Sequence, residues 1–441
     1  MKRILISVAA WTGVAMMLSM PCRSALGGES PEGVLTLEKT IGLVRENHPA
    51  LKAAAEEITA ADARVTKSRS TWFPQITASA GYTYIDPVSE MSFGGSAPIK
   101  FMPNNNFDAK VTARATIFDF GKRGNGVELA LSGKRSAEHA LEISRRELSW
   151  QSVQLFYGNL LLHESIRVEQ KEIGALNKAL DFSTKRYQAG SATRFDLLST
   201  EVRIAAARSR ALDLAHALRR NELALRRLTG IADNEPLTLN GSFSVTPSAA
   251  RETGMVAQAL QQRLEVKLSI ENEKSASQKR SIAIKEGMPV ITGSASYGRT
   301  NGYQPDIEAI RNNIAAGLHL EIPIFTGFRN SAERQEATAL MHAATLRRLD
   351  TEQQVKNEVE EMLDGVQTSS KKLLTTDAQV NQAKLAAEHA RARFENGMAT
   401  TLDLLDTEAS LSQAELARLQ ATYEYVMSSY ALKRATGEVF W

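Results

Sequence analysis

The chain reads Arg186-Tyr-Gln-Ala-Gly190-Ser-Ala192-Thr193-Arg194-Phe-Asp196-Leu-Leu-Ser-Thr200-Glu201 and, 207 positions later, Arg393-Phe-Glu-Asn-Gly397-Met-Ala399-Thr400-Thr-Leu-Asp403-Leu-Leu-Asp406-Thr407-Glu408. Solenoid repeats have periods of roughly 20–50 residues. A repeat spaced this widely therefore indicates two copies of a whole structural unit.

Other pairs of segments repeat in the same order along the chain. Pro74-Gln-Ile76-Thr77 corresponds to Pro289-Val-Ile291-Thr292 at an offset of 215, and Ile117-Phe118 corresponds to Ile324-Phe325 at an offset of 207. The two units therefore differ in length by eight residues, all of them between Pro74 and Phe118. We expect a first repeat over residues 28–240, a linker at 241–251 and a second repeat over 252–441.

The first 27 residues have the pattern of a secretory signal peptide. Two cations, Lys2 and Arg3, precede an apolar run, and the small residues of Ala25-Leu26-Gly27 offer a cleavage site. Cleavage there would remove Cys22, the only cysteine, so no disulfide is expected. It would also leave 50 basic and 50 acidic residues, a balance that does not indicate a nucleic-acid partner.

Four segments alternate between apolar and polar residues, at about 74–86, 107–119, 289–299 and 312–325. In the second of them, Phe107, Ala109 and Val111 oppose Asp108 and Lys110. Each segment has about the ten residues of a tilted transmembrane strand, with one face for lipid and one for a lumen. A half-buried sheet in a water-soluble protein gives the same alternation, so the pattern of single strands leaves both readings open.

Long helical stretches connect the predicted strands. Two run from about Lys122 to Arg186 and from about Asn330 to Phe394, and each can reach roughly 100 Å at 1.5 Å per residue. Shorter ones cover about 37–70, 193–228, 252–285 and 400–435. Gly190 and Gly397 follow helices, where glycine allows the chain to reverse. We therefore expect two helical hairpins, with turns at about 188–196 and 395–403.

Four strands cannot close a membrane barrel. An open edge in lipid would leave backbone groups unpaired, at several kcal/mol each. Strands from several copies must therefore join. Two copies would give eight strands and a lumen filled by side chains, whereas three would give twelve and a water-filled bore. The residues alone leave both numbers open, and the polar lumen faces favour the larger pore.

These features together resemble the TolC family of outer-membrane efflux ducts. The resemblance covers nearly the whole mature chain and rests on Glu46-Asn-His48-Pro49-Ala-Leu51, on Trp72-Phe73-Pro74, on the Ile-Phe pairs that end at Phe118 and Phe325, and on the duplicated Gly-x-Ala-Thr-x-x-Asp-Leu-Leu turn. It implies a mainly α-helical protein with a transmembrane β-barrel. The family fold is a homotrimer whose 12-stranded barrel lies in outer-membrane lipid and continues as an α-helical tunnel through the periplasm.

The resemblance also implies a function. Family members are passive export channels, gated at the periplasmic tip, that work with a periplasmic adaptor (membrane fusion) protein and an inner-membrane transporter of the RND or ABC type. The duplicated turns would lie at this tip. The residues expected at the turns and at the adaptor contact are Gly190, Ala192, Gly397 and Ala399.

The second turn carries the residues that look like the family's acidic constriction, Asp403 and Asp406. A ring of carboxylates favours cations in a pore. Ordinary acids in the first turn of a helix, stabilised by the helix dipole, give the same pattern, and this is the default reading for Asp196. Family members often latch the tip with a tyrosine and an arginine where this chain has Phe394 and Ala399. A latch here would use other groups, with Arg194 and Tyr187 as the nearest in the first turn.

Two other classes of protein, an enzyme and a periplasmic adaptor, are alternatives to an export channel. The sequence has no His-Glu-x-x-His, Gly-x-Ser-x-Gly or phosphate-loop motif, so we expect no catalysis, no cofactor and no metal. The nearer alternative is a periplasmic adaptor with a coiled-coil hairpin, because such proteins are also exported and rich in helices. The alternating strands favour the channel.

Overall fold

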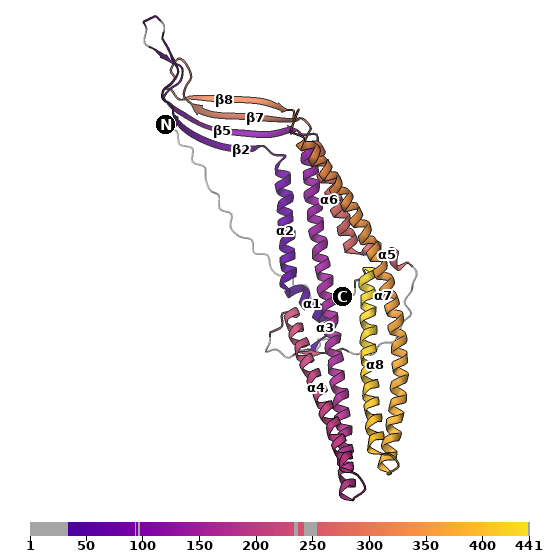
Figure 1. Cartoon of the computed structure of the whole chain (residues 1–441). Helices are drawn as coiled ribbons and strands as arrows, with labels where there is room; N and C mark the ends of the chain where they lie inside the picture. Colours follow the sequence, from indigo (N-terminus) through magenta and orange to yellow (C-terminus); the bar gives the residue numbers. More distant parts are fainter. Residues whose placement is uncertain (1–33, 93, 96–97, 233–236, 242–253, 440–441) are drawn as a thin grey trace, which may run out of the picture.

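The computed structural model describes residues 34–92, 94–95, 98–232, 237–241 and 254–439. The predicted signal peptide lies outside these residues. Figure 1 shows an elongated molecule in which one sheet caps a set of long helices. The expectation of a mainly helical chain with two long strands from each repeat is confirmed.

The large sheet has four antiparallel strands in the order β2, β5, β7 and β8. Their bounds are Gln75–Tyr84, Asn105–Phe118, Val290–Thr300 and Arg311–Glu321. The fourth strand was predicted to continue to about residue 325, but it ends before Pro323, which cannot donate a ladder hydrogen bond. Two short pairs complete the strands of the described residues: β1 (Val34–Leu35) with β6 (Thr238–Leu239), and β3 (Glu90–Met91) with β4 (Ile99–Lys100).

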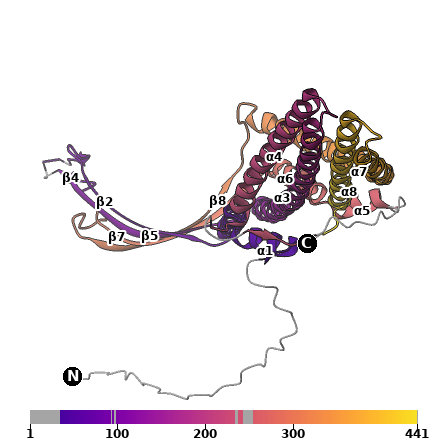
Figure 2. The same cartoon turned by 90° about the horizontal axis from the view of Figure 1, so that it is seen from below.

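The register of the large sheet places the apolar residues of all four strands on one face. Two neighbouring rows show this: Ile76–Ala113–Ala295–Ala316 and Ala78–Val111–Tyr297–Ile314. None of the described residues covers this face, since Ile314 is 78% and Leu318 75% exposed. Figure 2 shows the sheet as a curved strip that extends to one side of the helices. The strip therefore presents an exposed apolar face that no other described helix or strand of the chain covers.

Exposed aromatic side chains mark both ends of this sheet. At the end that joins the helices they are Trp72, Phe73, Phe118, Phe120, Phe325 and Phe328. At the far end they include Tyr82, Tyr84 and Phe107, and the rings of Tyr82 and Phe107 lie 5.1 Å apart. Aromatic girdles above and below an apolar band are typical of transmembrane strands.

The longest helices, α3 (Lys122–Gln188) and α7 (Arg329–Glu395), have 67 residues each. Each is followed by a 36-residue partner, α4 (Arg194–Thr229) or α8 (Thr401–Thr436), which runs back along it as a hairpin. The upper half of the helical layer is completed by α2 (Pro49–Ser70) and α6 (Leu264–Lys285). Among the described residues, no helix has both the length and the apolar character to cross a membrane.

Two stretches that were predicted as single helices are each broken in two. The first gives α1 (Leu37–Asn47) and α2, with His48 extended at φ −66° and ψ 123°. The second gives α5 (Met255–Gln262) and α6, with Arg263 at φ −63° and ψ 128°. Pro49 explains the first break, because a proline disfavours helical backbone at the residue before it. The second break has no proline, although Arg263 occupies the position equivalent to His48 at the offset of 215.

Arg263, the residue between α5 and α6, forms ion pairs with two glutamates. The Arg263 side chain is only 8% exposed, and its guanidinium donates to Glu265 (2.9 Å), Glu358 on α7 (2.7 Å) and the backbone carbonyl of Ala435 on α8 (3.3 Å). Burial lowers the pKa of Arg263, but the hydrogen bonds to Glu265 and Glu358 and the charges of these carboxylates outweigh it, so the pKa is raised. An arginine thus joins three helices at the position where the other repeat uses the His-Pro step.

Apolar clusters hold the helices of this layer together. Around the middle of α3, Val153 and Phe156 pack against Leu37 and Ile41 of α1. Nearer the hairpin turns, Leu176 on α3 contacts Ile204 and Ala207 on α4 and Leu405 on α8. This second cluster joins the two hairpins of one chain, which lie side by side in Figure 2.

Candidate functional site at the hairpin turns

The two repeated turns have the same backbone geometry. Gly190 follows α3 with φ 71°, and Gly397 follows α7 with φ 74°. The N–H of Ser191 donates to the Arg186 carbonyl at 2.8 Å, and the N–H of Met398 donates to the Arg393 carbonyl at 2.7 Å. A left-handed residue with such a bond ends a helix and satisfies its last carbonyls, and glycine adopts this conformation without strain.

Each turn leads directly into a capping box. The carboxylate of Asp196 accepts from the N–H and the hydroxyl of Thr193, at 2.8 and 2.6 Å. The carboxylate of Asp403 accepts from the same two groups of Thr400, at 2.9 and 2.7 Å. These bonds lower the pKa of both carboxyls, and the Thr401 hydroxyl and Arg186 contribute further at Asp196. Both aspartates are thus ionised near neutral pH and positioned by their own helix N-termini.

The capping role accounts for the hydrogen bonds of Asp403 within one chain. Asp403 is nevertheless exposed. An ionised, exposed carboxylate at a hairpin tip is the group that an acidic ring requires. The ring itself needs other copies of the chain and stays a prediction.

The second predicted ring residue, Asp406, pairs with an arginine that the sequence analysis did not select. Arg203 on α4 donates to the Asp406 carboxylate at 2.7 Å and to the Leu405 carbonyl at 3.3 Å. The pair ties the first hairpin to the second. A signal for it exists in the repeat, because Arg203 and Asp406 each have a serine at the equivalent position, Ser410 and Ser199.

The aromatic residues at equivalent positions of the two turns differ in burial. Phe394 is 2% exposed and packs against Phe182 of α3, with ring centres 5.0 Å apart, and against Leu404. Tyr187 is 44% exposed. Phe394 therefore anchors the second hairpin to the first by packing.

The remaining predicted turn residues have different surroundings. Ala399 contacts the cluster around Phe394, whereas Ala192 is half-buried in the first turn. Arg194 is exposed, and the described residues of the single chain include no ion pair from it, so a latch through Arg194 stays a prediction. Gly190 and Gly397 are both exposed at the tips of their hairpins.

A buried acid stabilises the second hairpin close to its turn. The Glu408 side chain on α8 is 6% exposed and accepts two hydrogen bonds from Arg391 on α7, one of them at 2.7 Å. This contact raises the pKa of the guanidinium. The Arg391–Glu408 pair holds α7 to α8, whereas the Arg203–Asp406 pair joins different hairpins.

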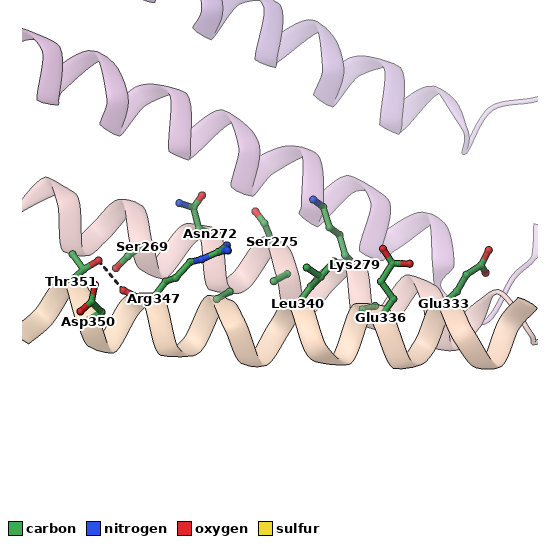
Figure 3. A pocket seen from close by; sticks show the side chains of 13 residues that line it. Ser269, Asn272, Ser275, Lys279, Glu333, Glu336, Leu340, Arg347, Asp350 and Thr351 are labelled. Carbon is green, nitrogen blue, oxygen red and sulfur yellow. Dashed lines mark hydrogen bonds between the residues drawn. The ribbon is translucent and has the colours of Figure 1, made fainter.

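A groove of about 740 Å³ lies between α6 and α7, far from the turns. Figure 3 shows its lining of mixed charge, with Lys279 on α6 and Glu336, Arg347 and Asp350 on α7. No group of His, Cys, Asp and Glu within the described residues is arranged to hold a metal ion. The mixture of charges gives this groove no preference for one class of ligand.

The fold is that of solved outer-membrane channels. The outer membrane protein VceC of Vibrio cholerae has the same fold, with a TM-score of 0.80 at 21% identity over 92% of this chain and 97% of that one. Residues 40–231 and 255–438 match the sequence profile described as outer membrane efflux protein. The chain therefore belongs to the outer membrane efflux protein family, and its location is the outer membrane.

Named relatives align over most of their length. The outer membrane protein TolC of Vibrio cholerae is 23% identical over 400 residues, which cover 89% of this chain and 88% of the relative. The alkaline protease secretion protein AprF of Pseudomonas aeruginosa is 23% identical over 413 residues, 90% of this chain and 83% of the relative. These relatives are transport proteins and not enzymes.

Proposed function

We propose that three copies of this chain form a passive export duct, with a 12-stranded barrel in the outer membrane and a helical tunnel in the periplasm, closed at rest by the hairpin turns. The main observation behind this proposal is that the four-stranded sheet has two unpaired edges. Within the described residues, strands β2 and β8 each pair on one side only, and the apolar face between them is exposed. In lipid such edges must be paired, and joining β8 of one copy to β2 of the next pairs every edge.

The helical layer supports the same assembly. In its upper half the helices pack in the order α2, α3, α6 and α7, which leaves α2 and α7 at the edges. The edge helix α7 exposes Leu346 and Leu349. A ring of three copies would place α7 of one copy beside α2 of the next and cover these leucines, whose burial is favourable by up to about 1.5–3 kcal/mol each.

The turns support a gate. Three copies would gather six hairpin tips around one axis, with Asp403 exposed and ionised at three of them. Such carboxylates select cations in a narrow pore. The Arg203–Asp406 pair and the packing of Phe394 hold the second hairpin against the first, and opening requires these contacts to be released.

The partners follow from the position of the turns. The exposed tips, with Gly190 and Gly397 at their ends, would face the periplasmic adaptor and, through it, an inner-membrane transporter. Some relatives are named for secretion, as AprF is, or for pyoverdine export, as OpmQ of Pseudomonas putida is. A periplasmic adaptor, the alternative function, would not need an exposed apolar sheet.

The decisive experiment measures assembly and conductance together. Protein purified from outer membranes should have the mass of three chains and should form water-filled channels in planar bilayers. An Asp403→Asn variant should keep the trimer and lose part of the cation preference. A monomeric or non-conducting purified protein would contradict the duct, whereas unchanged selectivity in Asp403→Asn would contradict the acidic ring alone.

Crosslinking in cells tests the partners. The mature chain is expected to have no cysteine, so a single new one gives a clean attachment site. Ser191→Cys and Met398→Cys, both at exposed turn positions, should crosslink to an adaptor. Thr83→Cys at the far end of the sheet is the matched control and should not. Equal capture at all three positions would contradict docking at the turns.

A further inference from the structure

The polar face of the sheet has a distribution of charge that the proposed gate does not explain. Because neighbouring residues of a strand point to opposite faces, the register assigns whole cross-strand rows to this face. The middle rows are Thr77–Thr112–Ser296–Ala315, Gln75–Arg114–Ser294–Gly317 and Thr116–Thr292–His319. These three rows contain no carboxylate, and Arg114 is their one permanent charge.

The nearest acids of this face lie closer to the ends of the strands. Asp108 is in the far part of the sheet and is paired with Lys110 at 2.9 Å. Glu321 is the last residue of β8, at the end that joins the helices. Among the described residues Arg114 makes no ion pair, and its side chain is exposed. Its guanidinium is therefore a positive charge that the sheet itself does not neutralise.

The neighbours of Arg114 leave space around it. In its own row it lies between Gln75 on β2 and Ser294 on β7, and the next strand contributes Gly317. An added Cβ on Gly317 would meet nothing within 4 Å. Small uncharged side chains on this side allow the long arginine side chain to extend away from the wall.

We propose that Arg114 forms an anion-attracting ring inside the barrel, one guanidinium from each copy, at a depth where the wall has no carboxylate. This inference rests on the proposed trimeric duct, in which the polar face lines the lumen. Arginine rings favour anions and phosphate groups in pores, and a lumen walled by protein and lipid focuses their field. The duct then has two charge filters of opposite sign in series, acidic at the periplasmic tip and basic in the membrane.

The ring has a consequence for the cargo. An anionic group, such as a carboxylate or phosphate, would be attracted in the barrel after passing the tip. The guanidinium binds such groups through two parallel hydrogen bonds, which distinguishes it from a lysine at the same position. The effect of a free anion therefore depends on the side to which it is added, because an anion from the barrel side reaches Arg114 before it meets the acidic tip.

The test uses single channels of the purified full-length protein in planar bilayers, with inorganic phosphate added on the barrel side. Phosphate should reduce the current of the unmodified channel. Arg114→Gln should relieve this reduction and raise the potassium-to-chloride permeability ratio about twofold or more. Arg114→Lys keeps the positive charge and should leave the permeability ratio close to that of the unmodified channel. Arg299→Gln is the matched control, since Arg299 lies on the apolar face of the same sheet.

The outcomes separate this inference from the proposed function. A conducting trimer in which Arg114→Gln leaves both phosphate sensitivity and the permeability ratio unchanged would overturn the ring and leave the duct intact. An equal effect of Arg299→Gln would also overturn it, because the response would then not come from the lumen. A protein that is neither trimeric nor conducting would overturn both.

Discussion

Arg203 on α4 and Asp406 on α8 form an ion pair of 2.7 Å between the two hairpins of one chain. The position equivalent to each of them in the other repeat holds an uncharged residue. The equivalent positions hold Ser410 and Ser199. An exact copy of the first repeat would have an arginine without its acid, and an exact copy of the second an acid without its arginine. The pair therefore exists only because the two repeats diverged at both positions, and it connects their hairpins.

Removing this pair should loosen the closed tip. The two side chains are 33% and 60% exposed, so the pair contributes about 0.2–1 kcal/mol. We expect Arg203→Gln to raise the open fraction of single channels by up to about fivefold for each of the three pairs that opening breaks. The measurement is open probability in planar bilayers.

A charge exchange provides the control for this effect. The double variant Arg203→Asp/Asp406→Arg should return the open probability toward that of the unmodified protein. Failure of the exchange to restore closure, with the trimer intact, would show that Arg203 acts through some contact other than the ion pair.

Phe394 and Tyr187 form a matched pair for testing the packing between hairpins. Phe394→Ala would remove a ring that is 2% exposed, and we expect a cost of about 3–5 kcal/mol. Tyr187→Ala at the equivalent position should cost less than about 1 kcal/mol, because its ring is half-exposed. Hydrogen exchange of the turn peptides measures both. Similar losses of protection in the two variants would contradict an anchoring role for Phe394.

The fold could be predicted from the sequence because its signals repeat. The alternation over Phe107–Phe118 placed the apolar face correctly, and the glycines at 190 and 397 marked both turns. The break at Arg263 could not be predicted, since its cause is contacts with Glu358 and Ala435, which are distant in the sequence. Local propensity continues the helix there, and tertiary hydrogen bonds override it.

The turns were located from the sequence more easily than their contacts. Thr193 and Asp196 have the spacing of a capping box, which is a local signal. The Arg203–Asp406 pair joins residues 203 positions apart, and Arg203 lies two residues beyond the repeated segment, so no local pattern marks it. Arg203 can be found by comparing the charges of the two repeats over one further helical turn, where it is equivalent to Ser410.

Arg210 offers a test of how α3 and α4 are held together. It donates to Glu169 at 3.0 Å and to Glu172 at 2.9 Å, and these carboxylates are 1% and 6% exposed. Arg210→Gln would leave two buried negative charges without a partner. We expect a loss of about 2–4 kcal/mol, below the full cost of breaking a buried pair because Arg210 is itself 47% exposed. Thermal unfolding in detergent measures the change.

Neutralising all three groups should reverse much of this loss. In Arg210→Gln/Glu169→Gln/Glu172→Gln no buried charge remains, and the triple variant should be more stable than Arg210→Gln alone. If the triple variant unfolds at a lower temperature than the single one, uncompensated charge is not what destabilises the hairpin.

Acid should loosen the turns through their capping boxes. The hydrogen bonds from Thr193 and Thr400 hold the pKa of Asp196 and of Asp403 below the usual 3.8. A carboxyl whose pKa is lowered by folding stabilises the native state fully above pH 3.8, and this contribution is lost as the pH falls through the lowered pKa. Hydrogen exchange, corrected for intrinsic rates, should therefore show less protection in both turn peptides at pH 3 than at pH 6.

Thr400→Val separates this effect from general acid unfolding. The substitution removes the hydroxyl donor to Asp403 and leaves the backbone N–H in place, so the pKa of Asp403 should move back toward its usual value. The second turn should then lose protection at a higher pH than the first, within the same protein. If both turns respond to acid at the same pH in Thr400→Val, the threonine hydroxyl is not what sets the acid sensitivity of the second turn.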